Sequence, residues 1–434
     1  MASLNFFLYR TLGALALGPA LALPVFKGRF GTRWPDRFGY TLAGGGQPLW
    51  LHAASVGEAQ SGLLVFEALR QLGFKEPVLL SAATPAGLAI LTAKTKKAQN
   101  YQIAAPPLDF LGAPARFLDR VVPKALIIIE TEIWPELFYQ CQKRSIPVLM
   151  LSARLSQRSH QRLRHFKAFM AQTLSIPALV ATISQSDLDL LIDLGLEPKK
   201  AQVLGSPKYD ALIQKAAGLL AQGLPAAQAF SEKPLILAGS THPGEEELIL
   251  SSIMSLAKPE AALALAPRHL TRLAELESLV ASFGLKPVLF SQSHQLRPGP
   301  GQVTLVDKIG LLSDLYGHCD LAIIGGSFFD RAGHNPAGHN PFEPVAYGKA
   351  LIFGPNMLSF KREAEDLEAL GVATRTPKAF LNQAISDLLE EPDRTRALGH
   401  KGQKYLASQK LVAPVLAQLA LDFLENLKAK AQEN

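Results

Sequence analysis

Two acidic motifs in the first half of the chain have residue types suited to proton transfer. The first runs from His52 through Ser55 to Glu58, and the second is Glu130-Thr-Glu-Ile-Trp-Pro135. Each follows an apolar run, and Glu58 stands where a helix would begin. If both runs are strands of one parallel sheet, Glu58 and Glu130 meet at its carboxyl edge, where paired carboxylates suit general-base work on a hydroxyl. Ordinary stabilisation of the first helical turn is the alternative for Glu58.

The second half of the chain carries residues suited to holding a phosphate. Ser240 and Thr241 end one apolar run, and Arg268 and His269 end the next. Backbone N–H groups and hydroxyls at a helix N-terminus bind phosphate without a metal. An arginine can add two parallel hydrogen bonds. Each segment taken alone is typical of an ordinary loop, but their coincidence at one sheet edge favours a phosphate site.

A glycine-rich segment follows the apolar run 321–324. The turn at Gly326 and Ser327 lets backbone N–H groups approach a ligand, and ligands of open α/β sheets bind at this edge. Glu343, bracketed by prolines, suits a ribose diol. The segment 332–336 is repeated at once as 337–341, and only the second copy runs into Glu343. We therefore favour Asn340 over Asn335 as the binding residue, with the first copy as the alternative.

The elements that must position these residues alternate between apolar runs and helical patterns. This alternation predicts two parallel sheets covered by helices on both faces. The predicted strands are 48–53, 77–80, 125–129, 147–151 and 179–183 in a first series, and 235–238, 261–265, 321–324 and 350–353 in a second. The fold class is thus α/β, with two doubly wound, Rossmann-like domains facing a cleft.

The domain boundaries follow from the same pattern. We predict an N-terminal anchor over 1–30, a first Rossmann-like domain over 31–212, a linker over 213–232 and a second Rossmann-like domain over 233–434. The C-terminal helix has the option of packing back on the first domain. Two cysteines, Cys141 and Cys319, allow at most one disulfide and match no metal spacing, which favours a reduced, intracellular setting.

The N-terminal segment 4–26 is apolar apart from a few residues and is followed by basic ones. It is marginal for a span of about 20 residues, since Arg10 and two prolines lie within it. By the positive-inside rule, the basic flank keeps the following domain in the cytoplasm. We expect a membrane anchor, either one span or an interfacial helix.

The net charge of +7 is concentrated between Leu137 and Ser186, where no acidic residue occurs. Arg154, Arg158 and Arg162 recur every four residues, so they would share one face of a helix. A solvated helix is the plain interpretation. We favour instead a patch for anionic groups, either phosphates of the acceptor or a membrane surface. A nucleic-acid partner is not expected, since no RNA-binding signature appears.

Taken together, these motifs resemble the 3-deoxy-D-manno-octulosonic acid (Kdo) transferases of lipopolysaccharide synthesis. The resemblance covers nearly the whole chain through the segments 52–58, 130–135, 152–156, 205–210, 239–246, 267–269, 307–316 and 325–344. It implies the GT-B glycosyltransferase fold, an N-terminal membrane-associated helix at the cytoplasmic face of the inner membrane, and a metal-independent, inverting mechanism without a cofactor. The implied reaction moves Kdo from CMP-Kdo to a tetraacylated lipid A precursor.

The resemblance also assigns roles. Glu58 would be the general base, and Glu130 the second essential carboxylate on the acceptor side. The residues implied to hold CMP are Lys208, Ser240, Thr241, Arg268, His269, Gly326, Ser327, Asn340 and Glu343. The chain departs from the family pattern at Ser152, at Ser206-Pro207, at Leu311 and in the duplicated loop.

Two other functions remain open from the sequence. One is a GT-B enzyme that uses another nucleotide sugar, such as an acetylglucosamine transferase. The other is a membrane-tethered lipid-A-binding protein without turnover, which the presence of both Glu58 and Glu130 disfavours. The number of Kdo residues transferred and the oligomeric state also stay open.

Overall fold

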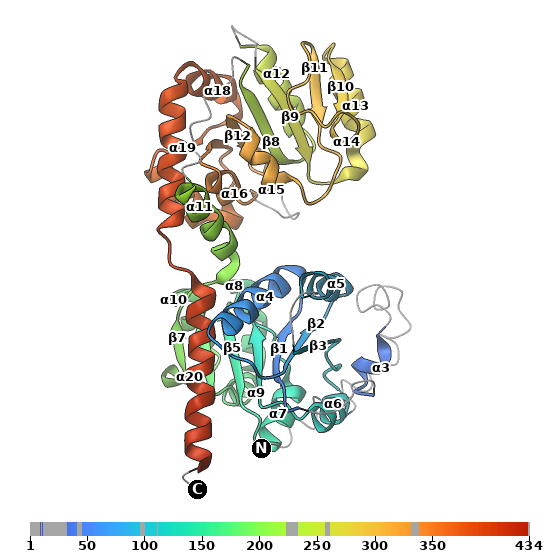
Figure 1. The fold of residues 1–434 in the computed structure, drawn as a ribbon, viewed down its shortest axis with the longest axis vertical. Coiled ribbons are helices and arrows are strands. Elements are labelled where there is room, and N and C mark those ends of the chain that lie inside the picture. The colour runs from blue at the N-terminus through green and yellow to red at the C-terminus, as the bar shows by residue number, and fades with distance from the viewer. Residues whose placement is uncertain are drawn as a thin grey trace. The chain divides into compact units, whose positions relative to one another are not determined.

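The computed structural model describes residues 9, 11, 33–40, 46–95, 100–110, 112–222, 233–256, 261–330 and 338–432. The chain divides into two compact units, which we describe separately: unit 1 is 1–210 with 411–434, and unit 2 is 211–410 (Figure 1). Most of the predicted anchor, 1–30, lies outside the described residues. A search of the described helices finds none with the length and apolar character needed to cross a bilayer.

Unit 1 is built on a parallel sheet in the order β3-β2-β1-β4-β5-β6-β7. Its strands are β1 (Leu49–Ala53), β2 (Val78–Ala82), β3 (Tyr101–Ala104), β4 (Ala125–Ile129), β5 (Val148–Ala153), β6 (Leu179–Thr182) and β7 (Ala201–Val203). Every residue of β1, β2, β4 and β5 is buried. Strands covered on both faces need continuous apolar runs, which explains why these four are readable in the sequence.

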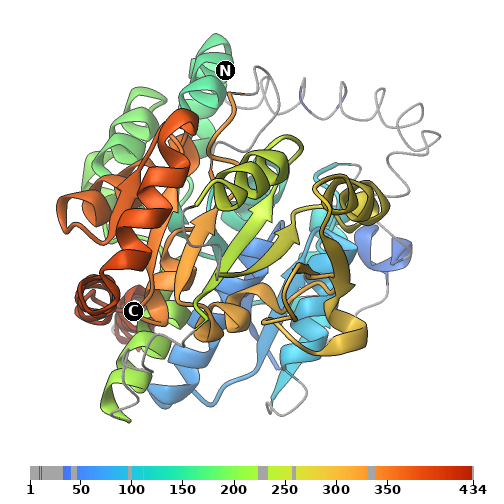
Figure 2. The ribbon, with the colours of Figure 1, turned by 90° about the horizontal axis from the view of Figure 1, so that it is seen from above.

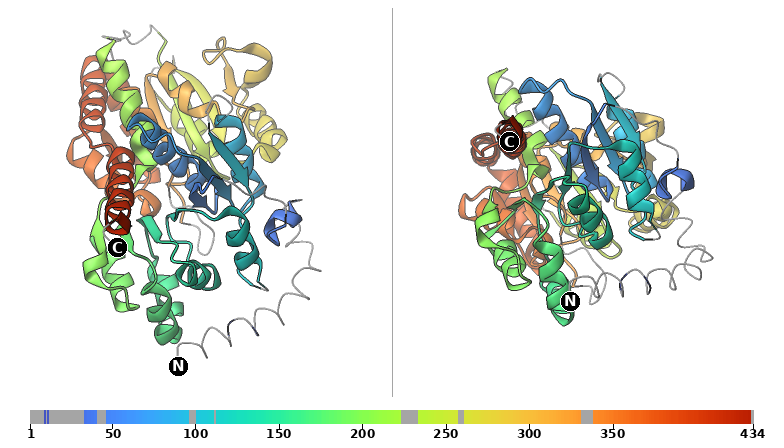
Figure 3. Two further views of the ribbon diagram at one scale, coloured as in Figure 1. Left: turned by 60° about the horizontal axis from the view of Figure 1, so that its bottom comes forward. Right: turned by 90° about the horizontal axis from the view of Figure 1, so that it is seen from below.

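Helices cover both faces of this sheet (Figure 3). They are α3 (Trp34–Arg37), α4 (Val56–Gln71), α5 (Pro85–Lys94), α6 (Ala113–Val121), α7 (Pro135–Lys143), α8 (Gln157–Leu163), α9 (Lys167–Leu174), α10 (Gln185–Asp193) and α20 (Val412–Gln432), with short 3-10 turns η1 (Arg164–Phe166), η2 (Pro198–Lys200) and η3 (Pro207–Tyr209). One core lies between the sheet and α4, α5 and α20, and the other lies between the sheet and α6, α7, α9 and α10.

Unit 2 repeats the architecture with a parallel sheet in the order β10-β11-β9-β8-β12-β13-β14. Its strands are β8 (Leu235–Thr241), β9 (Ala262–Pro267), β10 (Lys286–Leu289), β11 (Gln302–Leu305), β12 (Leu321–Ile324), β13 (Ala350–Phe353) and β14 (Ala373–Arg375). The order of connections reverses between β8 and β12, and ligands of such sheets bind at that point.

The helices of unit 2 are α11 (Asp210–Ala221), α12 (Glu245–Met254), α13 (Leu273–Ser282), α14 (Phe290–Ser293), α15 (Leu312–Leu315), α16 (Phe342–Ala346), α17 (Lys361–Ala369), α18 (Leu381–Glu390) and α19 (Pro392–Ala407), with 3-10 turns η4 (Leu270–Arg272), η5 (Tyr316–His318), η6 (Leu358–Phe360) and η7 (Lys378–Phe380). Helices α12, α13 and α18 pack on one face of the sheet, where the yellow-green α12 is seen from above in Figure 2.

The chain leaves unit 1 and re-enters it at two points that lie close together. It leaves after Asp210 at the start of α11, so the predicted linker 213–232 begins inside a helix that continues to Ala221. It returns before α20, which packs along α4 (Figure 1). The buried Asp210 carboxylate accepts hydrogen bonds from the amides of Val412 (3.1 Å) and Ala413 (2.6 Å), so a single side chain ties the two crossings together.

Candidate active site

Glu58 is held in a reciprocal cap at the start of α4. The Ser55 hydroxyl accepts a hydrogen bond from the amide of Glu58 (3.3 Å) and donates one to Glu58 Oε1 (2.9 Å). The amide of Ala54 donates to Oε2 (2.6 Å). This is the capping box that a Ser-x-x-Glu sequence predicts. Glu58 therefore does stabilise the first turn of α4. The same hydrogen bonds fix the orientation of its half-buried carboxylate close to the end of β1.

Glu130 stands at the end of β4 in a strained backbone conformation. Its φ of 63° lies in the left-handed region, which is uncommon for glutamate. Its amide donates to the carbonyl of Leu151 (2.8 Å), and its carboxylate pairs with Arg154 Nε at 2.8 Å. Non-glycine residues held in this region concentrate at functional sites, because the surrounding structure must stabilise them.

Glu58 and Glu130 are brought together, because β1 and β4 are neighbouring strands. Burial is the main cause of a raised pKa at Glu130, and the negative charge of Glu58 raises it further, while Arg154 and Lys208 oppose the shift. Lys208, which the resemblance assigns to CMP, therefore acts on this pair from η3 of the same unit. Unit 1 thus presents two interacting carboxylates with two cations at one sheet edge.

Ser152 lies beside this pair at the end of β5. It also has a positive φ, 57°, it is fully buried, and its hydroxyl has no hydrogen-bond partner among the described residues. The pairing of β5 with β6 shifts register between Met150 and Ala153. The strand ends at Glu130 and Ser152 are therefore both distorted where the predicted chemistry lies.

The predicted helical face of three arginines is wrong for Arg154. Strand β5 runs to Ala153 and Ser156 caps α8, so Arg154 lies between two elements and reaches Glu130 instead. Arg158 and Arg162 do lie in α8 and are exposed. Asp193 contacts His160 and pairs with Arg164 and Lys167, whereas no described residue forms an ion pair with Arg158 or Arg162.

In unit 2, the predicted phosphate-binding residues meet at the ends of β8 and β9. Ser240 has a φ of 56°, and the fully buried hydroxyl of Thr241 has no hydrogen-bond partner within the described part of the chain. The amide of Arg268 donates to the carbonyl of Thr241 (3.0 Å), and the side chains of Arg268 and His269 are exposed. A strained turn, a buried hydroxyl and an exposed guanidinium are suited to an anion.

A pair of histidines joins this site and is not among the residues predicted to bind. His242 Nε2 lies 2.9 Å from His339 Nε2, and the rings stack with centroids 5.2 Å apart. At that distance one imidazole donates to the other. His269 meets His242 edge-on at 6.0 Å. His339 belongs to the second copy of the repeat, whereas the first copy, 332–336, lies outside the described residues.

The amides of Gly326 and Ser327 are engaged within the protein, which corrects the expectation that they face the donor. They donate to the Glu245 carboxylate at 2.7 Å and 2.9 Å. The Ser327 hydroxyl donates to the carbonyl of Ile324 and accepts from the amide of Gly354. Asn340 Oδ1 accepts from the amide of Phe342 (3.1 Å), and Glu343 is half-buried in the first turn of α16.

The histidine pair predicts a pH dependence of stability. Burial, aided by His242, Arg268 and His269, lowers the pKa of His339 from 6.5 to about 4. The unfolded chain then binds more protons than the folded one between these values, so the contribution of His339 is present above pH 6.5 and is lost towards pH 4. As the pH is lowered, we expect the Tm of the wild type to fall more steeply than the Tm of His339→Asn. Thermal melts of both proteins at pH 7, 6 and 5 measure this difference.

The control for that measurement is His318→Asn, which removes an exposed histidine of the same unit. Its melting curve should keep the wild-type pH slope. Parallel curves for the wild type and His339→Asn over the whole range would show that His339 does not titrate as described.

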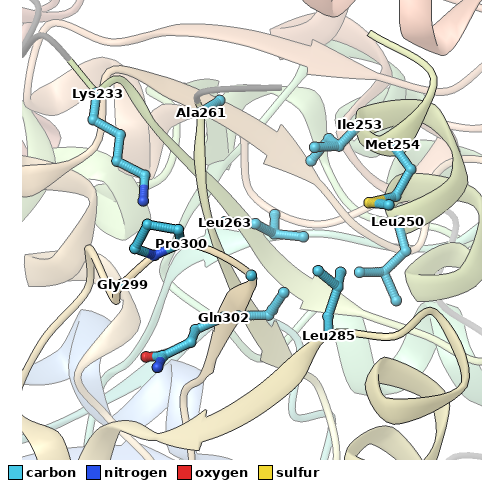
Figure 4. A pocket seen from close by; sticks show the side chains of 12 residues that line it. Lys233, Leu250, Ile253, Met254, Ala261, Leu263, Leu285, Gly299, Pro300 and Gln302 are labelled. Carbon is cyan, nitrogen blue, oxygen red and sulfur yellow. The ribbon is translucent and has the colours of Figure 1, made fainter. Parts of the chain in front are cut away.

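One cavity of unit 2 lies at the opposite end of its sheet, where β8, β9 and β11 begin. It has a volume of about 370 Å³ and an apolar lining that includes Leu250, Leu263 and Leu285, with Lys233 at its rim (Figure 4). It brings together none of the predicted site residues. Among the described residues, no group of three His, Cys, Asp or Glu side chains is placed to hold a metal ion.

Comparison with known proteins decides the family. Residues 32–211 match the family model for 3-Deoxy-D-manno-octulosonic-acid transferase (kdotransferase). A 3-deoxy-D-manno-octulosonic acid transferase of Bordetella pertussis is 31% identical over 92% of this chain and 95% of its own length. This chain belongs to the Kdo transferase family. A Haemophilus influenzae transferase of the same name is 30% identical over 93% of this chain and 94% of its own length.

The family membership confirms the resemblance drawn from the motifs, and it makes the chain a glycosyltransferase. The fold is confirmed as GT-B by the two parallel sheets and by solved structures. Anabaena Alr3699/HepE in complex with UDP, for example, is similar with a TM-score of 0.53 and 15% identity, over 88% of this chain and all of that one. At this identity the likeness concerns the fold.

Proposed function

We propose that this Kdo-family enzyme transfers Kdo from CMP-Kdo to a hydroxyl of the tetraacylated lipid A precursor. The reaction releases CMP, inverts the anomeric carbon and uses no metal or other cofactor. The observation that carries the proposal is the interacting carboxylate pair Glu58 and Glu130 in a member of this family. A protein that only bound lipid A would have no need of a strained, paired acid beside an oriented one.

On the acceptor side, Glu58 takes the proton from the attacking hydroxyl. Its capping hydrogen bonds hold the carboxylate in place and leave each oxygen a further lone pair. Glu130, oriented by Arg154, lies beside it as the second carboxylate on the acceptor side. The freed oxygen forms a bond to the anomeric carbon of Kdo from the face opposite the phosphate.

On the donor side, the bond between the anomeric carbon and the phosphate oxygen breaks, and CMP leaves with the electron pair. A phosphate monoester is a good leaving group, so cations and dipoles can stabilise it without a metal. Arg268, His269 and the turn at Ser240 and Thr241 are proposed to take this role, which the exposure of the Arg268 and His269 side chains supports. Asn340 and Glu343 are proposed to hold the nucleoside, and Lys208 is proposed to reach the phosphate.

The test is nucleotide binding followed by turnover. CMP should raise the Tm, and UDP at the same concentration should raise it much less, since a ligand stabilises by RT ln(1 + [L]/Kd). Kdo transfer to the lipid A precursor should then appear when CMP-Kdo is supplied. A larger shift with UDP would favour the other candidate, a GT-B enzyme with another nucleotide sugar, and CMP binding without transfer would favour a binding protein.

We also propose that the enzyme works at the cytoplasmic face of the inner membrane. Arg158 and Arg162 support this location, because they are exposed in α8 without described acidic partners. The neighbouring Phe166 is 65% exposed. Exposed arginines beside an aromatic ring suit an anionic lipid surface or the phosphates of the acceptor.

The double variant Arg158→Gln and Arg162→Gln should bind anionic vesicles about 30-fold more weakly, since each basic residue near such a surface contributes about 1 kcal/mol and the two together about 2 kcal/mol. Sedimentation with vesicles measures the affinity, which should also fall with added salt. Lys199→Gln with Lys200→Gln is the control, because it removes the same charge from η2, where Glu197 already pairs with both lysines. Equal binding of wild type and Arg variant, insensitive to salt, would mean that α8 is only a solvated helix.

A further inference from the structure

Glu245 is the most completely coordinated carboxylate described in unit 2. It is the first residue of α12 and is 1% exposed. Oε2 accepts from the amides of His242 (3.0 Å) and Gly326 (2.7 Å), and Oε1 accepts from those of Ser327 (2.9 Å) and Phe328 (3.0 Å). Four backbone dipoles therefore point at one buried anion.

This arrangement has the form of a phosphate site. Successive N–H groups of a turn make an anion-binding concavity, and a helix N-terminus adds a favourable dipole. Gly326, with a φ of 71°, gives the turn its curvature. No ion pair to Glu245 occurs among the described residues, so the amides themselves stabilise the charge. The protein fills its own anion hole at the point where the sheet order reverses, between β8 and β12.

A second polar group at the same strand end is left open. Thr241, one residue before His242, is fully buried and its hydroxyl has no described partner. Ser240 beside it is held at a positive φ. Arg268, whose amide donates to the Thr241 carbonyl, lies at the same strand end, and so does the pair of imidazoles of His242 and His339. Unit 2 thus has two adjacent polar positions at one edge: one is filled by Glu245, and the other has a buried hydroxyl without a described partner beside the exposed Arg268.

We propose that Glu245 determines the class of donor by standing where a second phosphate would bind. The position at Arg268 and the Ser240–Thr241 turn takes the single phosphate of a nucleoside monophosphate sugar. A nucleoside diphosphate would have to place its other phosphate against the Glu245 carboxylate, where charge repulsion and the lack of free amides exclude it. This inference rests on the proposed function, in which a nucleotide sugar binds in unit 2.

The test compares CMP and CDP by isothermal titration calorimetry on the full chain. The wild type should bind CMP at least about tenfold more tightly than CDP, which corresponds to about 1.4 kcal/mol. Glu245→Ala empties the amide hole, so the preference should shift towards CDP by about tenfold or more. Sodium acetate, whose carboxylate fits the emptied hole, should compete with CDP in this variant.

Glu247→Ala is the matched control, because it removes an exposed acid from the same helical turn. It should keep the wild-type preference. An unchanged preference in Glu245→Ala would overturn the inference. If that variant does not fold, the wild type alone still decides: equal affinities for CMP and CDP would overturn it and leave the proposed Kdo transfer intact. Binding of neither cytidine nucleotide would instead count against the proposed function.

Discussion

Glu58→Gln is expected to lower kcat by about two orders of magnitude or more, with the affinity for CMP unchanged. Glutamine has the size of glutamate and also serves in a capping box, so the hydrogen bonds with Ser55 and the fold of α4 should survive. What the amide cannot do is accept the proton of the acceptor hydroxyl. Release of CMP from CMP-Kdo in the presence of the acceptor measures kcat, and calorimetry measures the affinity for CMP.

The control is Glu67→Gln, an exposed acid of the same helix. It should leave both quantities near wild type. If Glu58→Gln also turns over at the wild-type rate, Glu58 only caps α4 and the base is another group. A loss of rate accompanied by a lower Tm would instead point to a disturbed helix, so the Tm of each variant belongs to the same experiment.

Gly325→Ala is expected to damage unit 2 more than any ordinary glycine substitution. An added Cβ would lie 2.6 Å from the carbonyl carbon of Ser240, 2.7 Å from Cα of Thr241 and closer still to the Ser240 oxygen. These are backbone atoms that no side-chain rotation can move. The amide of Gly325 also donates to the carbonyl of Gly239 (2.9 Å), so β12 and β8 would have to separate at the turn that we propose binds phosphate.

Overpacking commonly costs about 1–3 kcal/mol, and we expect the upper end of that range or more. The Tm should fall clearly, and the affinity for CMP should fall by at least about tenfold because Ser240 and Thr241 move. Gly218→Ala is the control: nothing lies within 4 Å of its added Cβ, and alanine favours a helix such as α11. A variant Gly325→Ala as stable as Gly218→Ala would show that the strand ends are far more adaptable than this packing implies.

The central strands could be predicted from the sequence because burial on both faces demands continuous apolar residues. The runs 125–129 and 321–324 are predicted and observed with the same bounds. The edge strands β3, β7, β10 and β14 are missed, because a strand with one free edge tolerates residues such as Gln102, Lys286 and Arg375. Strand β11 is missed because Thr304 interrupts its apolar run, and only the fold supplies the partner of that hydroxyl, the carbonyl of Gln295.

For the site, the sequence predicts which residues stand at strand ends, since that depends on local order alone. It places Glu58, Glu130, Ser240 and Arg268 at such ends, as observed. The sequence cannot show which backbone amides and side chains already have hydrogen-bond partners within the protein. The partnership of Glu245 with the turn at Gly326 joins distant segments, and so does that of His242 with His339. An acidic first-turn residue has the same local signature whether it faces solvent or fills an anion hole.

The path of α20 bears on how the protein is made. Leu416, Ala417 and Ala420 complete the core of unit 1 against α4, the helix that begins beside Glu58. A ribosome delivers all of unit 2 before these residues emerge, so unit 2 has its whole sequence available first. Until these residues emerge, unit 1 lacks one wall of its core, and the apolar surface left exposed makes the nascent chain prone to aggregate. A premature stop shortly after Lys410 would thus spare the donor half and leave the half with Glu58 open to proteolysis.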